Sequence, residues 1–177
     1  RKIGIVLNDN KKQPVKKGWE NVYTDKELQS LPFSQECMRK LVTDFQFETV
    51  LDVGSGAGAH ANYLQKKGKN VTAVDFGTSI YFEKRADNYE CYQGDFMTLD
   101  FEKKFDCIWA SHVLEHQENP GAFLKRCIEL TNNDGVIAIT VPPLKHQIVG
   151  GHLTLWNAGL LLYQLCFNGL DCSDASI

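Results

Sequence analysis

From Thr49 onward, short apolar runs alternate with stretches of helical periodicity, and this alternation restricts the fold more than any other feature of the sequence. The runs are rich in β-branched or aromatic residues and read TVLDV, NVTAVDF, YECYQ, FDCIWAS and GVIAITV. Runs that are apolar almost throughout are typical of strands buried on both faces of a parallel sheet. Strands and helices that alternate in this way predict right-handed βαβ units and a doubly wound, mostly parallel α/β sheet.

The intervening helices are predicted from apolar periodicity and from their start and stop signals. Asn119 suits an N-cap and Pro120 a first helical turn, while Gly68 and Gly169 suit the ends of two helices. The sequence therefore predicts four helices, at about 33–45, 58–68, 119–131 and 157–168. The final run, GLDCSDASI, resembles the start of one further strand.

The length and composition fit one globular domain. The chain has 177 residues, of which 43% are hydrophobic and 23% are charged. Residues 1–32 differ from the rest, because they are polar and lysine-rich and carry two isolated aromatic residues, Trp19 and Tyr23. We expect residues 1–32 to form an arm or lid, and residues 33–177 to form the domain.

Charge and cysteine usage argue against several classes of protein. The formal net charge is −3, with no basic stripe for nucleic acid and no polybasic amphipathic stretch for a membrane. The six cysteines include no C-x-x-C pair and no metal-ligand spacing, so we expect reduced thiols. No secretory signal or membrane span is visible, and these features together predict a cytoplasmic protein.

A glycine-rich turn is the strongest local signal. In VLDVGSGAGAH, a buried strand ends at Val53 and is followed by Gly54, Gly56 and Gly58. Glycine is needed where a chain turns tightly or where a ligand approaches the backbone, and the following helix directs its N–H groups at that ligand. The turn alone also satisfies the dinucleotide fingerprint, or could be a βα turn without a ligand.

Two acidic residues at the ends of later strands point to a nucleoside. Asp75 ends the run VTAVDF, roughly 20 residues after the glycines, where a carboxylate can accept hydrogen bonds from ribose hydroxyls. It also disfavours a cofactor with a 2′-phosphate. Asp95 lies in QGDFMTLDF, where it can accept from an exocyclic amine while Phe96 lines a ring pocket. Either aspartate could alternatively have a local structural role.

In this order, the segments VLDVGSGAG, VTAVDFG, GDFMTL, FDCIWASHVLEH and GVIAITVPP resemble the class I, Rossmann-like S-adenosylmethionine-dependent methyltransferases. The resemblance is greatest to bacterial small-molecule and sugar-pathway members, and it covers roughly residues 49–143. Such enzymes usually close their sheet with an antiparallel hairpin near the C-terminus, which we expect to be missing here. The resemblance implies methyl transfer with S-adenosylmethionine as the cofactor.

The resemblance also assigns roles to individual positions. Asp52 would hold the amino group of the methionine moiety, and the glycine turn would wrap that moiety and the ribose. Asp75 would bind the ribose hydroxyls, and the adenine would lie between the residues after the second and third strands. The complete set of predicted cofactor-binding residues is Asp52, Gly54, Ser55, Gly56, Gly58, Asp75, Phe76, Asp95, Phe96, Ser111 and His112.

Histidines after the fourth and fifth strands are the candidates for catalysis. An alcohol acceptor usually needs a general base, and histidine is the commonest one. We predict His152 first and His116 second for that role, with Glu115 orienting a histidine or the substrate. His60 is interpreted as structural, His146 lies on the same loop as His152, and no metal site is expected.

The predicted reaction is therefore methyl transfer to a small molecule, with an oxygen acceptor from a sugar or surface-glycan precursor preferred over nitrogen. Two alternatives stay open. One is an NAD-dependent oxidoreductase, against which Asp52 directly before the turn argues. The other is a non-catalytic module that binds S-adenosylmethionine.

Overall fold

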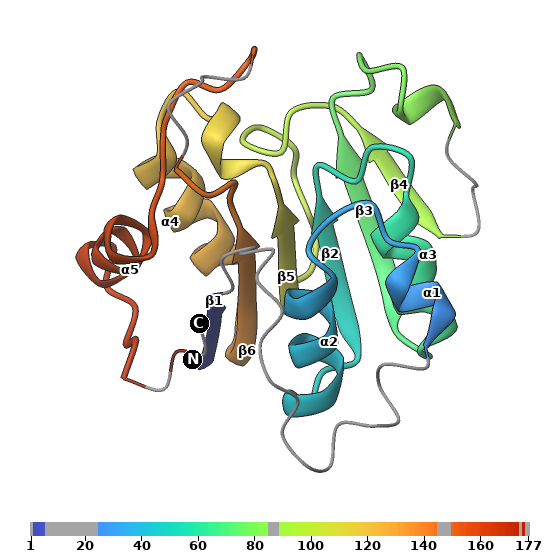
Figure 1. The fold of residues 1–177 in the computed structure, drawn as a ribbon, viewed down its shortest axis with the longest axis horizontal. Helices are drawn as coiled ribbons and strands as arrows, with labels where there is room; N and C mark the ends of the chain where they lie inside the picture. Colours follow the sequence, from blue (N-terminus) through green and yellow to red (C-terminus); the bar gives the residue numbers. More distant parts are fainter. Residues whose placement is uncertain (1, 6–24, 85–88, 145–149, 174, 176–177) are drawn as a thin grey trace.

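The chain forms a six-stranded sheet in the order β1-β6-β5-β2-β3-β4 (Figure 1). The computed structural model describes residues 2–5, 25–84, 89–144, 150–173 and 175. Every strand pairing is parallel. The strands are β1 Lys2–Ile5, β2 Thr49–Val53, β3 Asn70–Asp75, β4 Glu90–Gln93, β5 Phe105–Ser111 and β6 Thr131–Thr140. The predicted Rossmann-like α/β fold is thus confirmed.

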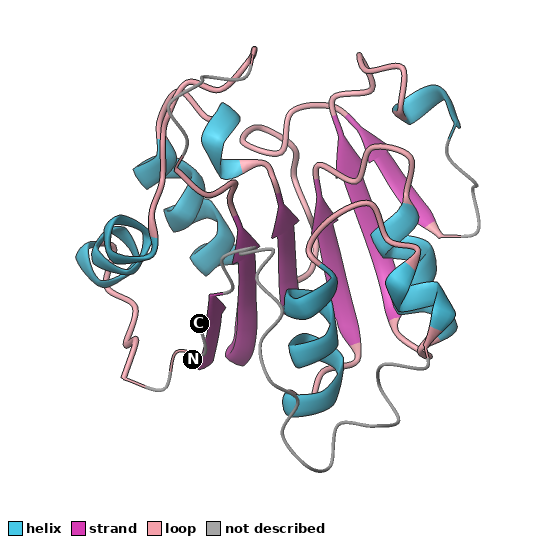
Figure 2. Cartoon of the chain, in the orientation of Figure 1, coloured by secondary structure: helices cyan, strands magenta, loops and turns pink. Residues whose placement is uncertain are grey.

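Helices cover both faces of this sheet (Figure 2). They are α1 Lys26–Gln29, α2 Gln35–Asp44, α3 Ala59–Lys66, α4 Pro120–Leu130 and α5 Ala158–Phe167, with short 3-10 turns η1 Phe82–Lys84 and η2 Leu114–His116. The caps expected from the sequence are present, because the side chain of Asn119 accepts from the Ala122 amide at 3.0 Å. Asn157 caps α5 in the same way, at 2.8 Å from the Leu160 amide.

Successive residues of the central strands face opposite sides, and this divides the core in two. Leu51, Ile108 and Ile137 pack with α4 and α5 on one side. Val50, Cys107 and the residues beside them on β6 pack with α1, α2 and α3 on the other. Near-continuous apolar strands are therefore required, as the sequence pattern predicted.

The order of the strands fixes where a ligand can bind. From β2 the chain builds outward through β3 to β4, and then returns to place β5 on the other side of β2. In open α/β sheets a ligand crevice lies at the carboxyl ends of the strands, at such a switch point. The registers place Val53 beside Ala110 and Ser111 beside Thr140, so the loops after β2, β5 and β6 open at the same edge.

Some expectations for the two ends of the chain were wrong. Lys2–Ile5 forms an edge strand beside β6, although it had been predicted as part of an arm. Leu28 and Leu31 are buried in the core, so the described part of residues 25–32 belongs to the domain. The predicted position of Trp19 and Tyr23 in a lid lies outside the described residues. After α5, residues 168–173 and 175 form no strand.

None of the helices in the described ranges is long and apolar enough to cross a bilayer.

At the amino ends of the strands, opposite the edge where a ligand is expected, the carboxylate of Asp106 joins the starts of β2, β5 and β6. It accepts from the amides of Glu48 and Thr49 at 3.1 and 2.9 Å and from the Thr49 hydroxyl at 2.9 Å. The side chain of Asn132 donates to it at 2.7 Å. These hydrogen bonds, that of the Thr49 backbone above all, lower the pKa of Asp106 to about 2.

We expect Asp106→Ala to lower the free energy of unfolding by about 1.5–3 kcal/mol at neutral pH, the typical contribution of hydrogen bonds to a charged group. Because the pKa of Asp106 is lower in the fold than in the unfolded chain, its ionised carboxylate stabilises the fold fully above pH 3.8. This stabilisation is lost as the pH falls from 3.8 through about 2. The difference between variant and parent should therefore shrink over that window. Urea unfolding measures it, and exposed Asp100→Ala is the control. A constant difference down to the lowest pH would contradict this account.

Candidate active site

The turn after β2 takes a backbone shape that requires glycine. Gly54, Gly56 and Gly58 have φ values of 70°, 52° and 76°, which side-chain-bearing residues rarely adopt. A Cβ on Gly54 would lie 2.5 Å from Cγ2 of Val113, on the segment that follows β5. The amides of Gly54 and Ser55 donate to the Val74 carbonyl, at 2.8 and 3.3 Å. The turn is thus held against both neighbouring loops.

The carboxylate of Asp75 links the turn after β2 to the turn after β3. Its Oδ2 accepts from the Gly56 amide and its Oδ1 accepts from the Gly77 amide, both at 2.9 Å. Each carboxylate oxygen can accept further hydrogen bonds. Asp75 therefore fixes the glycine turn, a role that the sequence did not predict. It also has capacity left for the ribose hydroxyl that the sequence did predict.

Asp52 is a buried acid directly below the turn. It is 2% exposed, and within the described part of the chain its Oδ2 has no hydrogen-bond partner. Burial and, to a smaller extent, the nearby charge of Asp75 raise the pKa of Asp52 to about 8, although a hydrogen bond from the Ala61 backbone opposes both. A neighbouring cation would stabilise the ionised form of this carboxyl.

The residues predicted around adenine separate into two groups. Phe76 is 57% exposed, and Ile80 and Tyr81 on the same loop are also exposed, so they offer a free apolar surface beside the glycine turn. Phe96 instead packs into the core against Phe101 and Phe123. The sequence predicted that Phe96 lines the adenine pocket, but the structure places its side chain in the core. The carboxylate of Asp95 accepts from the Met97 amide at 2.8 Å.

A hydroxyl cluster fixes the loop after β5. Ser111 lies 2.7 Å from the hydroxyl of Ser34, which in turn lies 2.7 Å from that of Thr140. The carbonyl of Phe33 is 3.0 Å from Nε2 of His60, and the Phe33 ring centroid is 5.0 Å from that of His112. Sequence reasoning missed Phe33 and Ser34 as residues of this edge, because only long-range contacts bring them there.

Glu115 is the most buried acid of the described residues on this side of the switch point. It is 0% exposed, and no hydrogen bond to either carboxylate oxygen is found among the described residues. Its nearest basic side chains are histidines: Oε1 lies 3.2 Å from Nδ1 of His112 and 4.0 Å from Nε2 of His116. Its backbone carbonyl accepts from the amides of Leu153 and Thr154, at 2.8 and 3.1 Å.

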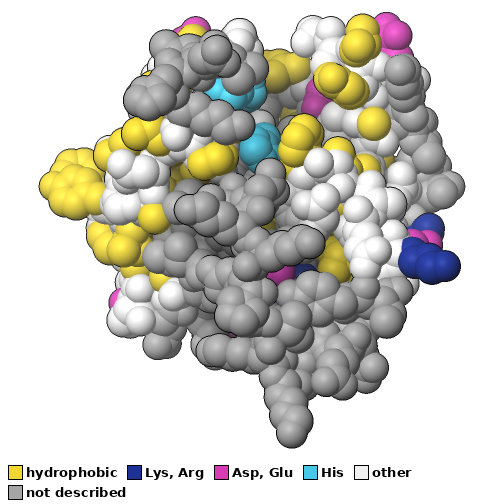
Figure 3. Space-filling view, in the orientation of Figure 1, with side chains coloured by type: hydrophobic (Ala, Val, Ile, Leu, Met, Phe, Trp, Pro, Cys, Tyr) yellow, Lys and Arg dark blue, Asp and Glu magenta, His cyan; other side chains and the backbone are white. Residues whose placement is uncertain are grey.

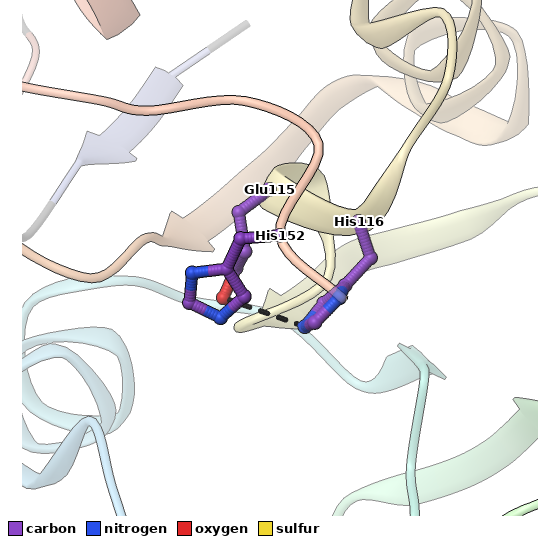
Figure 4. A group of neighbouring side chains, drawn as sticks. All are labelled: Glu115, His116 and His152. Atoms are coloured by element: carbon purple, nitrogen blue, oxygen red, sulfur yellow. Dashed lines mark ion pairs between the residues drawn. The ribbon is translucent and has the colours of Figure 1, made fainter. Parts of the chain in front are cut away.

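These backbone hydrogen bonds bring the predicted catalytic residues together. His116 and His152 contact each other edge to face, with ring centroids 4.8 Å apart. One nitrogen or oxygen from each of Glu115, His116 and His152 lies within 4.8 Å of the others. Figure 4 shows the three side chains converging from η2 and from the loop that precedes α5. His146 lies outside the described residues.

The surface around this edge is apolar and histidine-bearing. In Figure 3, histidine side chains lie among hydrophobic ones in the upper part of the molecule, where the strands end.

A separate pocket of about 530 Å³ lies between the start of α4 and the segment that leads into α5. Since none of the predicted site residues lines it, it is not part of the candidate active site.

The comparisons agree with this geometry. Residues 51–139 match the family described as a methyltransferase domain. The chain is 31% identical over 99 residues to a ubiquinone biosynthesis O-methyltransferase of Bradyrhizobium diazoefficiens, covering 51% of this chain and 38% of that protein. It is 32% identical over 100 residues to an alpha N-terminal protein methyltransferase of Dictyostelium discoideum, covering 50% of this chain and 37% of that protein. The chain spans less than half the length of these curated relatives.

Among solved structures, the chain resembles a Burkholderia thailandensis N1-methyltransferase of 1,6-didemethyltoxoflavin, solved with S-adenosylhomocysteine. The TM-score is 0.60 at 22% identity, over 84% of this chain and 70% of that one. This likeness shows a shared fold. The chain belongs to the methyltransferase-domain family, and the predicted class of protein, with S-adenosylmethionine as its cofactor, is confirmed.

The residues of the glycine turn fit that cofactor. Gly54 and Gly58 leave no room for a Cβ, since one on Gly54 would lie 2.5 Å from the Val113 side chain and one on Gly58 would overlap the Tyr89 side chain. Asp52 and Ser55 each have a buried oxygen with no hydrogen-bond partner among the described residues. Unpartnered buried polar atoms are costly, and a ligand with hydroxyl and ammonium groups would satisfy them.

We expect Asp75→Ala to weaken the binding of S-adenosylhomocysteine roughly tenfold to a hundredfold, because a charge-assisted hydrogen bond contributes about 1.5–3 kcal/mol. Isothermal titration calorimetry measures the affinity. Asp95→Ala, which removes a carboxylate from the neighbouring loop, compares the two predicted acidic contacts. Unchanged affinity in a folded Asp75 variant would remove Asp75 from the site.

A second prediction concerns the pH dependence of stability. The pKa of Asp52 is 3.8 in its ordinary state and about 8 in the fold, so the folded chain holds an extra proton between these values. The free energy of unfolding then decreases as the pH rises through this window. Because asparagine does not titrate, we expect the free energy of unfolding of Asp52→Asn, measured with urea, to change less with pH over this window than that of the parent. Asp134→Asn, at an exposed position, is the control, and parallel profiles for Asp52→Asn and the parent would refute the prediction.

Proposed function

We propose that this chain transfers a methyl group from S-adenosylmethionine to an oxygen of a small-molecule acceptor in the cytoplasm. The observation that carries the proposal is the glycine turn fixed by Asp75 in a chain of the methyltransferase family. The donor supplies a methyl group on a sulfonium, which is already electrophilic. The protein then has to align the acceptor and exclude water.

On the donor side, the proposed contacts follow the polar groups at the strand ends. Asp52 holds the ammonium of the methionine moiety, which its buried carboxylate favours electrostatically. Asp75 accepts from the ribose hydroxyls. Phe76 covers one face of the adenine, and Asp95 accepts from its amine. The backbone of the glycine turn lies along the methionine moiety and the ribose.

On the acceptor side, the proposal rests on Glu115, His116 and His152. A neutral amine can attack a methyl sulfonium unaided, whereas an alcohol usually needs its proton removed or its acidity increased. Two imidazoles beside a buried carboxylate suit that second task. His152 has the role of removing the proton or orienting the acceptor, with His116 as the second candidate. The O-methyltransferase relatives support an oxygen acceptor, and a sugar-derived acceptor is proposed from the sequence resemblance alone.

Methylation of nitrogen is the second candidate, and the Dictyostelium relative favours it. An NAD-dependent oxidoreductase and a non-catalytic binding module are the alternatives from other classes. The methyltransferase and oxidoreductase hypotheses differ in whether S-adenosylhomocysteine or NAD binds. Methylation of oxygen and of nitrogen differ in how strongly turnover depends on the histidines.

The cofactor is tested by calorimetry with S-adenosylhomocysteine and NAD on the same preparation. We expect micromolar binding of S-adenosylhomocysteine, on the order of −8 kcal/mol, and no measurable binding of NAD. The charge and position of Asp52 and the shape of the glycine turn favour this result. Tight binding of NAD with no response to S-adenosylhomocysteine would overturn the proposed function.

The acceptor side is tested by His152→Ala, with turnover followed on candidate alcohols and amines. Loss of a general base typically costs about 10²–10⁴-fold in rate, and we expect a loss of that order with an alcohol. The affinity for S-adenosylhomocysteine should stay nearly unchanged, because other loops supply its contacts. His116→Ala run in parallel separates the two candidates. Parental turnover of His152→Ala would favour an amine acceptor or His116.

A further inference from the structure

We propose that Glu115, His116 and His152 form a binding site for a divalent cation of the zinc class. The sequence made a metal site of histidine and glutamate the less favoured interpretation, because these residues follow no short ligand-spacing motif. The fold supplies the site instead from two segments, η2 and the loop before α5, which the hydrogen bonds of the Glu115 carbonyl hold together (Figure 4). The inference rests on the proposed function for its role, but not for its existence.

The tautomer of His116 supports this assignment. Its Nδ1 lies 2.7 Å from the carbonyl oxygen of Gly151, which has no hydrogen to give, so Nδ1–H donates. In neutral His116 the lone pair is then on Nε2, the nitrogen that faces Glu115. Metal-binding histidines usually donate their other ring N–H to a carbonyl or carboxylate in this way.

The buried carboxylate of Glu115 supplies the independent observation. A fully buried carboxylate is costly unless a cation or hydrogen bonds compensate it. Among the described residues, no hydrogen bond reaches either oxygen, and neither lysine nor arginine forms an ion pair with Glu115. At 4.0 Å, Nε2 of His116 is beyond hydrogen-bond distance from Oε1, but both can bind one ion placed between them. His112 lies 3.2 Å from the same oxygen through its Nδ1 and can orient it.

The donor set also selects the class of ion. Two imidazoles and one carboxylate, with an open fourth position, occur in catalytic zinc sites, where the zinc–ligand distances are about 2.0–2.2 Å. The three donor atoms lie within 4.8 Å of one another, so one ion placed between them can be reached by all three side chains once they adjust to it. The open position would take the oxygen of the acceptor and lower its pKa, as a zinc ion does for bound water. His152 then orients the acceptor through the ion.

Binding is tested with the metal alone on the purified full chain. Calorimetry with Zn²⁺ should show one site that His116→Ala and His152→Ala each weaken by at least about 100-fold, since loss of an outer-shell partner alone costs about 10–100-fold. Glu115→Gln should weaken it similarly, whereas Glu118→Gln, at an exposed neighbouring carboxylate, should not. Melting temperatures without metal verify that the variants are folded.

The cysteines require a spectroscopic control, because Cys166 is exposed and thiolates bind zinc well. Co²⁺ placed in the site should give ligand-field absorption without thiolate charge-transfer bands, and Cys166→Ser should leave it unchanged. Charge-transfer bands, absence of binding, or binding indifferent to His116→Ala and His152→Ala would each overturn the site. S-adenosylhomocysteine titrated into the same samples separates the two proposals. Binding of zinc with no binding of S-adenosylhomocysteine would refute the proposed function. Binding of S-adenosylhomocysteine with no binding of zinc would refute the metal site.

Discussion

Burial of the central strands on both faces is the constraint on which the rest of the structure depends. Because β2, β5 and β6 must be apolar on each side, polar side chains have room mainly where these strands end. The parallel registers then place all those ends at one edge. The residues proposed for donor binding and for acceptor chemistry therefore lie together at that edge.

Asp52 and Glu115 are the two acids among the described residues that are buried almost completely. Asp52 lies below the glycine turn on β2, and Glu115 lies after β5, so they flank the switch point from opposite sides. One carboxylate oxygen of Asp52 and both of Glu115 have no hydrogen-bond partner among the described residues. Natural folds retain such groups chiefly at functional sites, where a bound ligand compensates the cost of burial.

The periodic pattern from Thr49 to Phe167 was sufficient to predict the sheet, the caps of α4 and α5, and the glycine turn, because each depends on neighbours in sequence. β1 could not be predicted in the same way, since a four-residue edge strand is defined by pairing with β6. The roles of Ser34 and Phe96 depend on contacts across the fold, so their sequence neighbourhoods carried no signal or a misleading one. Glu115, His116 and His152 were predicted individually, whereas their convergence required the backbone hydrogen bonds between two loops.

The charges along this edge bear on how a methyl transfer would proceed there. Asp75 and Asp95 form no ion pair with a lysine or arginine within the described residues, and Asp52, whose pKa is about 8 in the fold, would ionise beside a cation. Such a surface binds a sulfonium more tightly than the neutral thioether that remains after transfer. Because this attraction weakens as the sulfonium loses its charge, it favours binding of the donor and does not accelerate the chemical step. Under the proposed function, the acceleration therefore comes from the other side of the switch point, where the acceptor would be held. The proposal thus assigns donor binding to the loops after β2 and β3, and acceptor chemistry to the loops after β5 and β6.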